Sequence, residues 1–318
     1  MRQPDSLFFS GQRWEAIAHE FFTAIEARET DILSPNLEFM ESLQETREWN
    51  MKLTVTLAQI AVTRSRPDLN IEKAEALTAE AARRGSGLIV FPEMWTTGFE
   101  WDYLKRAKEE HSRYAEQIAA MAGRHRIWIA GSIPLPDEEG KVANTQILFS
   151  DRGEKAAIYS KTHLFSLFHE EQHLAAGKHL TTADAPWGLT GLSICYDIRF
   201  PELYRTYALK GVKLILSPVA FPHPRLDHWK ILVRARAIEN QLFFVGVNQV
   251  GSEDPCSKDT VTYFGTSCII DPWGKTVVEA GENDEMLLTA TIETDYANEV
   301  RQSMRVLPDR RPDLYELG

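Results

Sequence analysis

The chain has 318 residues, a formal net charge of -11 and 43% apolar residues, which is the composition of a globular protein with a sizeable core. No block of five or more Lys and Arg residues is present, so the basic surface of a nucleic-acid-binding protein is missing. No stretch approaches the roughly 18 to 20 apolar residues of a membrane span, and the amino terminus lacks the parts of a secretory signal. We therefore expect a small-molecule partner, with no nucleic acid and no membrane.

The first 50 residues differ in composition from the rest, since they hold ten Asp and Glu residues against four Lys and Arg residues. Apolar side chains from Trp14 to Ile25 fall on one helical face. Ser34-Pro35 is typical of a helix start, and Leu37 to Leu43 continues that helix with an inward apolar face. The pattern predicts a helical acidic extension over residues 1–51 and one domain over residues 52–318. The extension is expected to be a packing arm, with a recognition or regulatory role as the alternative.

From Lys52 onward, strand patterns alternate with helix patterns. Residues Leu53 to Ala58 alternate as in a half-buried strand, and Ile71 to Ala81 follow helical spacing until Gly85 ends the helix. A second helix is expected from Tyr103 to Gly123, before a strand at Ile127 to Ala130. Further strands are predicted at 145–149, 155–159, 189–194, 213–216, 242–247, 262–270 and 286–292. This alternation predicts an α/β fold.

Three polar residues stand at the ends of apolar runs: Glu93, Lys161 and Cys195. In an α/β sheet the chemistry lies where strands give way to loops. A thiolate needs a nearby cation, which Lys161 could supply, and Glu93 could take the thiol proton and later activate water. Each residue alone has an ordinary structural explanation, as a buried small side chain, a helix cap or a solvated strand edge. The three together indicate a nucleophilic hydrolase.

Two other kinds of site remain open on the residues alone. The stretch from His169 to His173 fits the zinc-protease pattern H-E-x-x-H, with His179 near the place of a third ligand, although Gly177 stands one position late for the extended pattern. A thiol-protease pair would need His163 or His228 as the base, and spacing selects neither. The remaining cysteines, Cys256 and Cys268, are expected to be structural thiols. Because three cysteines are few and odd in number, no disulfide framework is expected, which favours a reducing, cytoplasmic location.

From Lys52 to Leu317 the chain resembles the nitrilase, or carbon-nitrogen hydrolase, superfamily. The matching motifs are Phe91-Pro92-Glu93-Met94, the run Tyr159 to Phe165, Cys195-Tyr196-Asp197-Ile198-Arg199-Phe200-Pro201-Glu202, the run Arg234 to Asn240, and Asp271-Pro272-Trp273-Gly274. The resemblance implies a four-layer α-β-β-α sandwich and a homodimer or higher homo-oligomer in which two sandwiches stack. It also implies that neither a metal nor another cofactor takes part.

The same resemblance assigns roles by position. It implies that Cys195 is the nucleophile, Glu93 the general base and acid, and Lys161 the cation that stabilises the tetrahedral intermediate. The N–H of Tyr196 would complete the oxyanion site. Glu170 would be a second glutamate that orients the lysine and the substrate. The glutamate of the H-E-x-x-H stretch would then serve an amidase and not a zinc protease.

The residues after the nucleophile are most similar to the omega-amidase branch, which removes the terminal amide from short 2-oxo acid monoamides such as 2-oxoglutaramate and 2-oxosuccinamate. True nitrilases usually have Trp-Glu where this chain has Tyr196-Asp197. The substrate's carboxylate would need a cation, for which Arg225 and Lys230 are the candidates, whereas Arg199 is expected to form an ion pair with Asp197 or Glu202. Phe221, where relatives often have Trp, would shape the pocket. The alternatives are hydrolysis of an N-carbamoyl amine or another small amide and, from a different class, a catalytically silent binding or scaffold protein.

Overall fold

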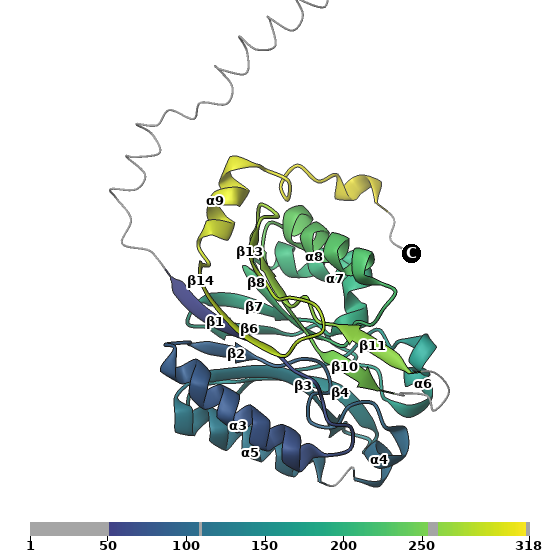
Figure 1. The fold of residues 1–318 in the computed structure, drawn as a ribbon. Helices are drawn as coiled ribbons and strands as arrows, with labels where there is room; N and C mark the ends of the chain where they lie inside the picture. Colours follow the sequence, from purple (N-terminus) through teal and green to yellow (C-terminus); the bar gives the residue numbers. More distant parts are fainter. Residues whose placement is uncertain (1–50, 108–109, 254–259, 316–318) are drawn as a thin grey trace, which may run out of the picture. The chain divides into compact units, whose positions relative to one another are not determined.

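The computed structural model describes residues 51–107, 110–253 and 260–315, so the two helices predicted before residue 51 lie outside the described residues. Two six-stranded sheets carry the fold. The first has the order β14-β1-β2-β3-β4-β5 and the second the order β13-β12-β9-β8-β7-β6 (Figure 1). The strands of the first sheet are β1 (Lys52–Gln59), β2 (Leu88–Val90), β3 (Trp128–Pro136), β4 (Val142–Phe149), β5 (Lys155–Ser160) and β14 (Met286–Glu293). Those of the second are β6 (Thr182–Ala185), β7 (Gly188–Leu192), β8 (Leu214–Val219), β9 (Phe243–Asn248), β12 (Cys268–Ile270) and β13 (Thr276–Glu279).

Helices cover the outer face of each sheet. Helices α3 (Pro67–Arg83) and α5 (His111–His125) lie on the first sheet, and α7 (Pro201–Leu209) and α8 (Leu226–Asn240) lie on the second (Figure 1). The predicted α-β-β-α sandwich is therefore confirmed. Among the described residues, no helix is long and apolar enough to cross a membrane.

Strand alternation explains why four layers form. In β2, Leu88 and Val90 face the core between the two sheets, whereas Ile89 faces the core under α3 and α5. Both faces of such a strand are buried, which is why the strand reads as an unbroken apolar run. The parallel pairs β1-β2-β3 and β7-β8-β9 form the centre of each sheet, and antiparallel strands complete the edges.

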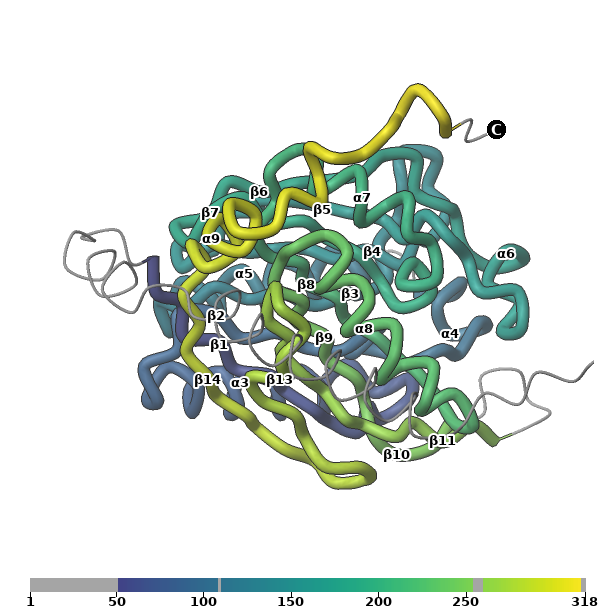
Figure 2. Tube along the Cα trace, turned by 90° about the horizontal axis from the view of Figure 1, so that it is seen from above, coloured from purple at the N-terminus to yellow at the C-terminus, as the bar shows by residue number. Residues whose placement is uncertain are grey.

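Smaller elements gather at one end of the sandwich. Helices α4 (Trp101–Arg106) and α6 (Glu170–His173) and the hairpin of β10 (Val250–Glu253) and β11 (Val261–Phe264) lie at the right-hand end in both views, while α9 (Tyr296–Ser303) lies at the other (Figure 2). Two short 3-10 turns, η1 (Ser166–Phe168) and η2 (Cys195–Arg199), precede α6 and α7, and a third, η3 (Pro312–Leu314), follows α9.

Several predicted elements differ from the structure. The single helix expected from Tyr103 to Gly123 is two helices, α4 and α5, and the ring of His111 at the start of α5 bonds back to the carbonyl of Leu104. The single strand expected over 262–270 is two, β11 and β12, because Gly265 and Thr266 both have positive φ angles that break an extended chain. The short strands β6, β10 and β13 were not predicted, since none contains an apolar run.

Candidate active site

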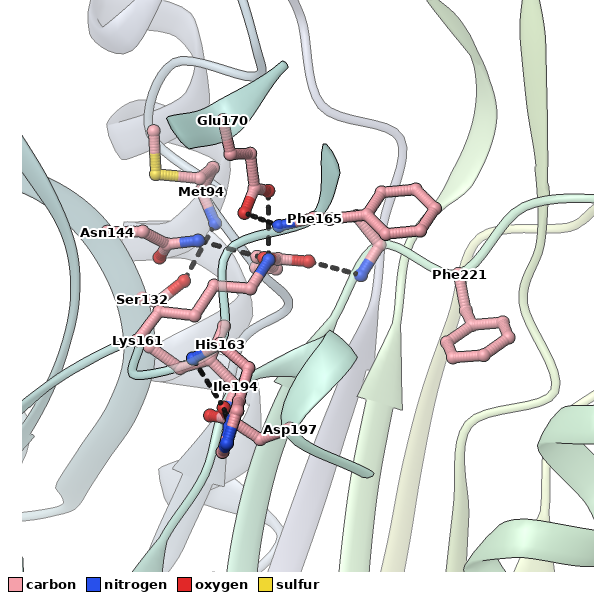
Figure 3. Close-up of polar contacts among 12 residues, drawn as sticks. Met94, Ser132, Asn144, Lys161, His163, Phe165, Glu170, Ile194, Asp197 and Phe221 are labelled. Atoms are coloured by element: carbon pink, nitrogen blue, oxygen red, sulfur yellow. Dashed lines mark hydrogen bonds and ion pairs between the residues drawn. The ribbon is translucent and has the colours of Figure 1, made fainter. Parts of the chain in front are cut away.

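Polar groups from the ends of β2, β5, β7 and β8, from β4 and from α6 meet in one buried cluster (Figure 3). Glu93 follows β2 after Phe91-Pro92, Lys161 follows β5 directly, and Cys195 follows β7. Two groups that the sequence did not indicate come from β4 and the end of β8: the side chain of Asn144 and the backbone N–H of Ala220. The sandwich thus brings residues up to 127 positions apart in the chain to one place.

Lys161, Glu93 and Glu170 form the charged cluster at the centre of this site. The Nζ atom of Lys161 lies 2.8 Å from Glu93 Oε1 and 2.8 Å from Glu170 Oε1, and all three side chains are about 1% exposed. Burial alone would lower the pKa of Lys161, but the two carboxylates outweigh burial and hold that pKa above its ordinary value. The two carboxylates therefore favour the charged form of Lys161 and hold it in position.

Each carboxylate of the charged cluster has further hydrogen bonds that fix its orientation. Glu93 Oε1 accepts from Asn144 Nδ2 at 2.8 Å and its Oε2 accepts from the Ala220 N–H at 2.9 Å. Glu170 Oε2 accepts from the Phe165 N–H at 2.8 Å. Burial raises the pKa of Glu170, and the second carboxylate, Glu93, adds to this effect against the opposing effect of Lys161. Two carboxylates held beside one ammonium ion in a buried site can hold and transfer a proton.

Cys195 opens η2 and is buried, with 9% of its surface exposed. Its φ angle is 43°, a left-handed conformation that costs a non-glycine residue about 1–3 kcal/mol and that recurs at functional sites. Burial raises the pKa of the thiol and the Glu93 carboxylate raises it further, whereas Lys161 and the Ala220 N–H act in the opposite direction. The thiol is therefore protonated at rest, and the neighbouring Glu93 carboxylate is the group that can accept its proton.

The histidines of the zinc-like pattern do not share a site with Glu170. Both oxygens of Glu170 are taken by Lys161 and the Phe165 N–H, while the side chain of His169 is 56% exposed. The ring of His173 stacks on Trp101 with centroids 4.8 Å apart. Within the described ranges, no group of three or more His, Cys, Asp or Glu side chains could hold a metal ion.

The histidines considered for a thiol-protease pair have other partners. His163 Nδ1 lies 2.7 Å from Asp197 Oδ1, and His228 Nδ1 lies 3.3 Å from the guanidinium of Arg199. The ion pair expected between Arg199 and Asp197 or Glu202 is wrong. The Arg199 guanidinium instead lies 5.4 Å from the ring centroid of Phe221, because Asp197 turns inward to other donors.

Aromatic rings lie among the residues that the sequence predicts to bind the substrate. The Tyr196 ring lies 4.9 Å from that of Phe165, over which the Arg225 guanidinium sits at 5.7 Å. The Phe221 N–H donates to Asn248 Oδ1 at 2.7 Å, directly after the Ala220 N–H that binds Glu93. Lys230 lies half-buried on α8. Cys268 is buried in β12, and Cys256 lies outside the described residues.

A surface cavity of about 530 Å³ lies away from this chemistry, on the outer face of β4 and β5. Thr145 and Ser160 line it, whereas their neighbours Asn144 and Lys161 point to the opposite side of the sheet, toward Glu93. Because side chains alternate along a strand, this cavity and the charged cluster lie on opposite faces of the sheet. We therefore place the candidate site at the cluster itself.

Comparisons with known proteins all find carbon-nitrogen hydrolases or amidases. A family model described as carbon-nitrogen hydrolase matches residues 54–302. The 2-oxoglutaramate amidase of Bacillus subtilis is 37% identical over 271 residues, covering 83% of this chain and 100% of that protein. An omega-amidase of Danio rerio is 33% identical over 281 residues, covering 84% of this chain and 98% of its own length. Among solved structures, a carbon-nitrogen hydrolase from Helicobacter pylori G27 superposes with a TM-score of 0.79 at 24% identity, covering 84% of this chain and 98% of that chain.

Proposed function

Since this chain belongs to the carbon-nitrogen hydrolase family, whose members hydrolyse carbon-nitrogen bonds other than peptide bonds, we propose that it is an omega-amidase that converts 2-oxo acid monoamides into dicarboxylates and ammonia. The observation that carries the proposal is the buried contact of Lys161 with both Glu93 and Glu170, next to the thiol of Cys195. No metal or other cofactor enters the proposed reaction.

In the first half of the reaction, Glu93 takes the proton of the Cys195 thiol and the thiolate attacks the carbon of the substrate amide. A carbon-sulfur bond forms and the carbonyl oxygen becomes an oxyanion. The Lys161 ammonium and the Tyr196 N–H stabilise this charge, which develops only as the transition state is approached. Glu170 holds the ammonium in place through its 2.8 Å contact.

In the second half, the intermediate collapses and the carbon-nitrogen bond breaks. Protonated Glu93 gives its proton to the departing nitrogen, so that ammonia leaves and a thioester remains on Cys195. Glu93 then takes a proton from water, the resulting hydroxide attacks the thioester, and the carbon-sulfur bond breaks. Glu93 gives the proton taken from water to the departing sulfur, which restores the thiol. The acid product ionises as it leaves, and its proton passes to the released ammonia.

The substrate class is supported by the names of the relatives and by the charges beside the site. A 2-oxo acid monoamide carries a carboxylate, which requires a cation in the pocket. We propose Arg225 for this role, because its guanidinium lies on the ring of Phe165, whose N–H binds Glu170. Lys230 is the second candidate, one turn further along α8, and Phe221 forms the wall beside Ala220.

The direct test is a substrate panel with an ammonia readout on the full chain. We expect 2-oxoglutaramate to be hydrolysed, Cys195→Ala to be inactive, and Cys268→Ala, which changes a buried thiol outside the site, to keep wild-type activity. Arg225→Gln is expected to raise KM for 2-oxoglutaramate more than kcat falls. Turnover of N-carbamoylputrescine alone would contradict the omega-amidase assignment, and an inactive, unreactive thiol would favour the binding or scaffold alternative.

A second substrate belongs in the same panel because of a specific relative. The deaminated glutathione amidase of Synechocystis is 36% identical over 262 residues, covering 77% of this chain and 94% of that protein. Its name indicates an amide substrate other than 2-oxoglutaramate. A kcat/KM for deaminated glutathione above that for 2-oxoglutaramate would move the assignment to this substrate without changing the mechanism.

We also propose that the chain forms a homodimer or a higher homo-oligomer through the outer face of α7 and α8. Leu209, Ile231 and Ile238 are 52%, 65% and 49% exposed there, and the two isoleucines are seven positions apart on one face of α8. Light scattering after size-exclusion chromatography is expected to show an oligomer that Ile231→Glu with Ile238→Glu dissociates. Leu69→Glu on α3 is the control, and a monomeric wild type would contradict the proposal.

The proposed location is the cytoplasm. The mechanism requires Cys195 as a free thiol, and reducing compartments keep thiols free. Cell fractionation with an antibody to this chain tests the location, and recovery from an oxidising compartment would contradict it.

A further inference from the structure

Asp197 is a fully buried carboxylate two residues after the nucleophile, and within the described residues it has no Lys or Arg partner. Hydrogen-bond donors surround it instead. Its Oδ1 accepts from the His163 N–H and from Thr162 Oγ1, both at 3.1 Å, and lies 2.7 Å from His163 Nδ1. Its Oδ2 accepts from Tyr159 OH at 2.7 Å and from the Ile194 N–H at 2.9 Å. Figure 3 shows Asp197 beside His163 and Ile194.

These donors come from two separate stretches of the chain. Tyr159, Thr162 and His163 flank Lys161 at the end of β5, whereas Ile194 directly precedes Cys195. One carboxylate therefore binds both the stretch that carries the ammonium and the turn that carries the thiol. A charged acceptor with two oxygens suits this position, because a neutral amide would turn an NH₂ group toward one set of donors.

The surroundings hold the carboxylate and its partners in this arrangement. Burial and the Asp197 charge raise the pKa of Tyr159, so its hydroxyl keeps the proton that it donates. The His163 ring stacks on Phe200, at the end of η2, with centroids 3.7 Å apart. The contact from Ile194 N–H to Asp197 closes the turn in which Cys195 has its positive φ angle.

We propose that Asp197 is a positioning residue that holds the Cys195 turn against the strand end carrying Lys161, and so sets the placement of the thiol relative to the ammonium ion. This inference rests on the proposed roles of Cys195 and Lys161. Neither the sequence nor the family resemblance assigned Asp197 this role, and Asp197 itself does not contact the reacting atoms.

The test compares Asp197→Asn with Asp184→Asn, which changes an exposed aspartate on β6. In folded protein, we expect Asp197→Asn to lower kcat for 2-oxoglutaramate by about a hundred-fold, the size of effect that follows a displacement of about 1 Å in an active site. KM is expected to stay within about three-fold, because Asp197 does not touch the substrate. Circular dichroism and thermal unfolding establish that each variant is folded, and Asp184→Asn is expected to match the wild type.

A second readout needs no substrate, so that it separates this inference from the proposed function. The rate of alkylation of Cys195 by iodoacetamide, followed by peptide mapping, reports how strongly Lys161 promotes the thiolate. We expect Asp197→Asn to slow alkylation at pH 8. If Asp197 acted only through its charge, removing that negative charge would favour the thiolate and speed the alkylation, which is the opposite sign.

A double-mutant cycle then asks whether Asp197 acts through Lys161. Lys161→Met alone is expected to slow alkylation, and adding Asp197→Asn is expected to slow it by no more than about two-fold further, because the placement of a missing ammonium no longer matters. If each substitution slowed alkylation by its own factor and the two factors multiplied in the double variant, the inference would be overturned. So would folded Asp197→Asn with wild-type kcat and a wild-type alkylation rate.

If Asp197→Asn fails to fold, His163→Phe replaces it. This variant can keep the stacking on Phe200 and removes the Nδ1 contact with Asp197. We expect kcat and the alkylation rate to fall by about ten-fold, the value of one hydrogen bond to a charged group. Unchanged values in folded His163→Phe would overturn the inference, whereas lack of amidase activity in the wild type would overturn only the proposed function.

Discussion

Replacing Glu170 by Gln tests how the charged cluster contributes to the reaction. The variant keeps the shape of the side chain and removes its charge. Glu170 accepts two hydrogen bonds, from Lys161 Nζ and from the Phe165 N–H, each of 2.8 Å. The amide of Gln has one oxygen, so at least one of these bonds is lost and an NH₂ group faces a donor.

The expected size of the effect follows from that loss. One hydrogen bond to a charged group contributes about 1.5–3 kcal/mol, and a tenfold change in rate corresponds to about 1.4 kcal/mol. We therefore expect Glu170→Gln to lower kcat/KM by about 10- to 150-fold. Stability is expected to change less, because two carboxylates surround one ammonium ion and the substitution also removes a buried like charge.

The assay is ammonia release from 2-oxoglutaramate, with thermal unfolding measured in parallel. Glu171→Gln is the matched control, since Glu171 is the next residue and its side chain is 48% exposed. The control is expected to keep wild-type kcat/KM. A loss of less than about three-fold in folded Glu170→Gln would refute the view that this carboxylate fixes the ammonium ion for the reaction.

Three further outcomes are expected. Asn144→Ala removes the 2.8 Å hydrogen bond to Glu93 and should also lower kcat/KM about 10- to 150-fold in the ammonia assay, and an unchanged value would exclude a role for Asn144. Gly177→Ala places a methyl group against the carbonyl of Ser160, beside Lys161, so the free energy of unfolding should fall by about 1–3 kcal/mol in denaturant titrations; Gly281→Ala, with open space around it, is the control, and equal stability of the two variants would contradict the packing argument. Burial raises the pKa of the Cys268 thiol, so above pH ~8.5 the unfolded chain releases a proton that the folded chain keeps, and stability should fall as pH rises. Thermal unfolding between pH 7 and 10 measures this fall, which Cys268→Ala should reduce by up to about 1.4 kcal/mol per pH unit; an identical slope in both proteins would contradict it.

The central strands could be predicted because they are buried on both faces and therefore appear as apolar runs. For the same reason, the polar residue that follows each run was visible as a candidate, and Glu93 and Lys161 do meet in one cluster. Edge strands such as β6 and β13 could not be predicted in this way, because solvent on one side leaves them without an apolar pattern.

The parts of the site that were missed lie within strands or in the backbone. Asn144 stands inside β4, a strand that is buried along its whole length, and a polar residue in such a strand was the signal that could have identified it. The Ala220 N–H carries no side-chain signal at all. An ion pair of Arg199 with Asp197 or Glu202 is predicted because these residues are near in sequence. The Asp197 carboxylate instead accepts from side chains more than 30 positions away and from the Ile194 N–H.

Mass spectrometry of the intact protein during turnover of 2-oxoglutaramate tests the central claim most directly. A reaction quenched in acid should contain a species heavier than the free chain by the mass of the substrate less that of ammonia. Peptide mapping should place this adduct on Cys195, and Cys195→Ala should show neither adduct nor ammonia release. Turnover that continues in Cys195→Ala, or an adduct on another residue, would contradict the account.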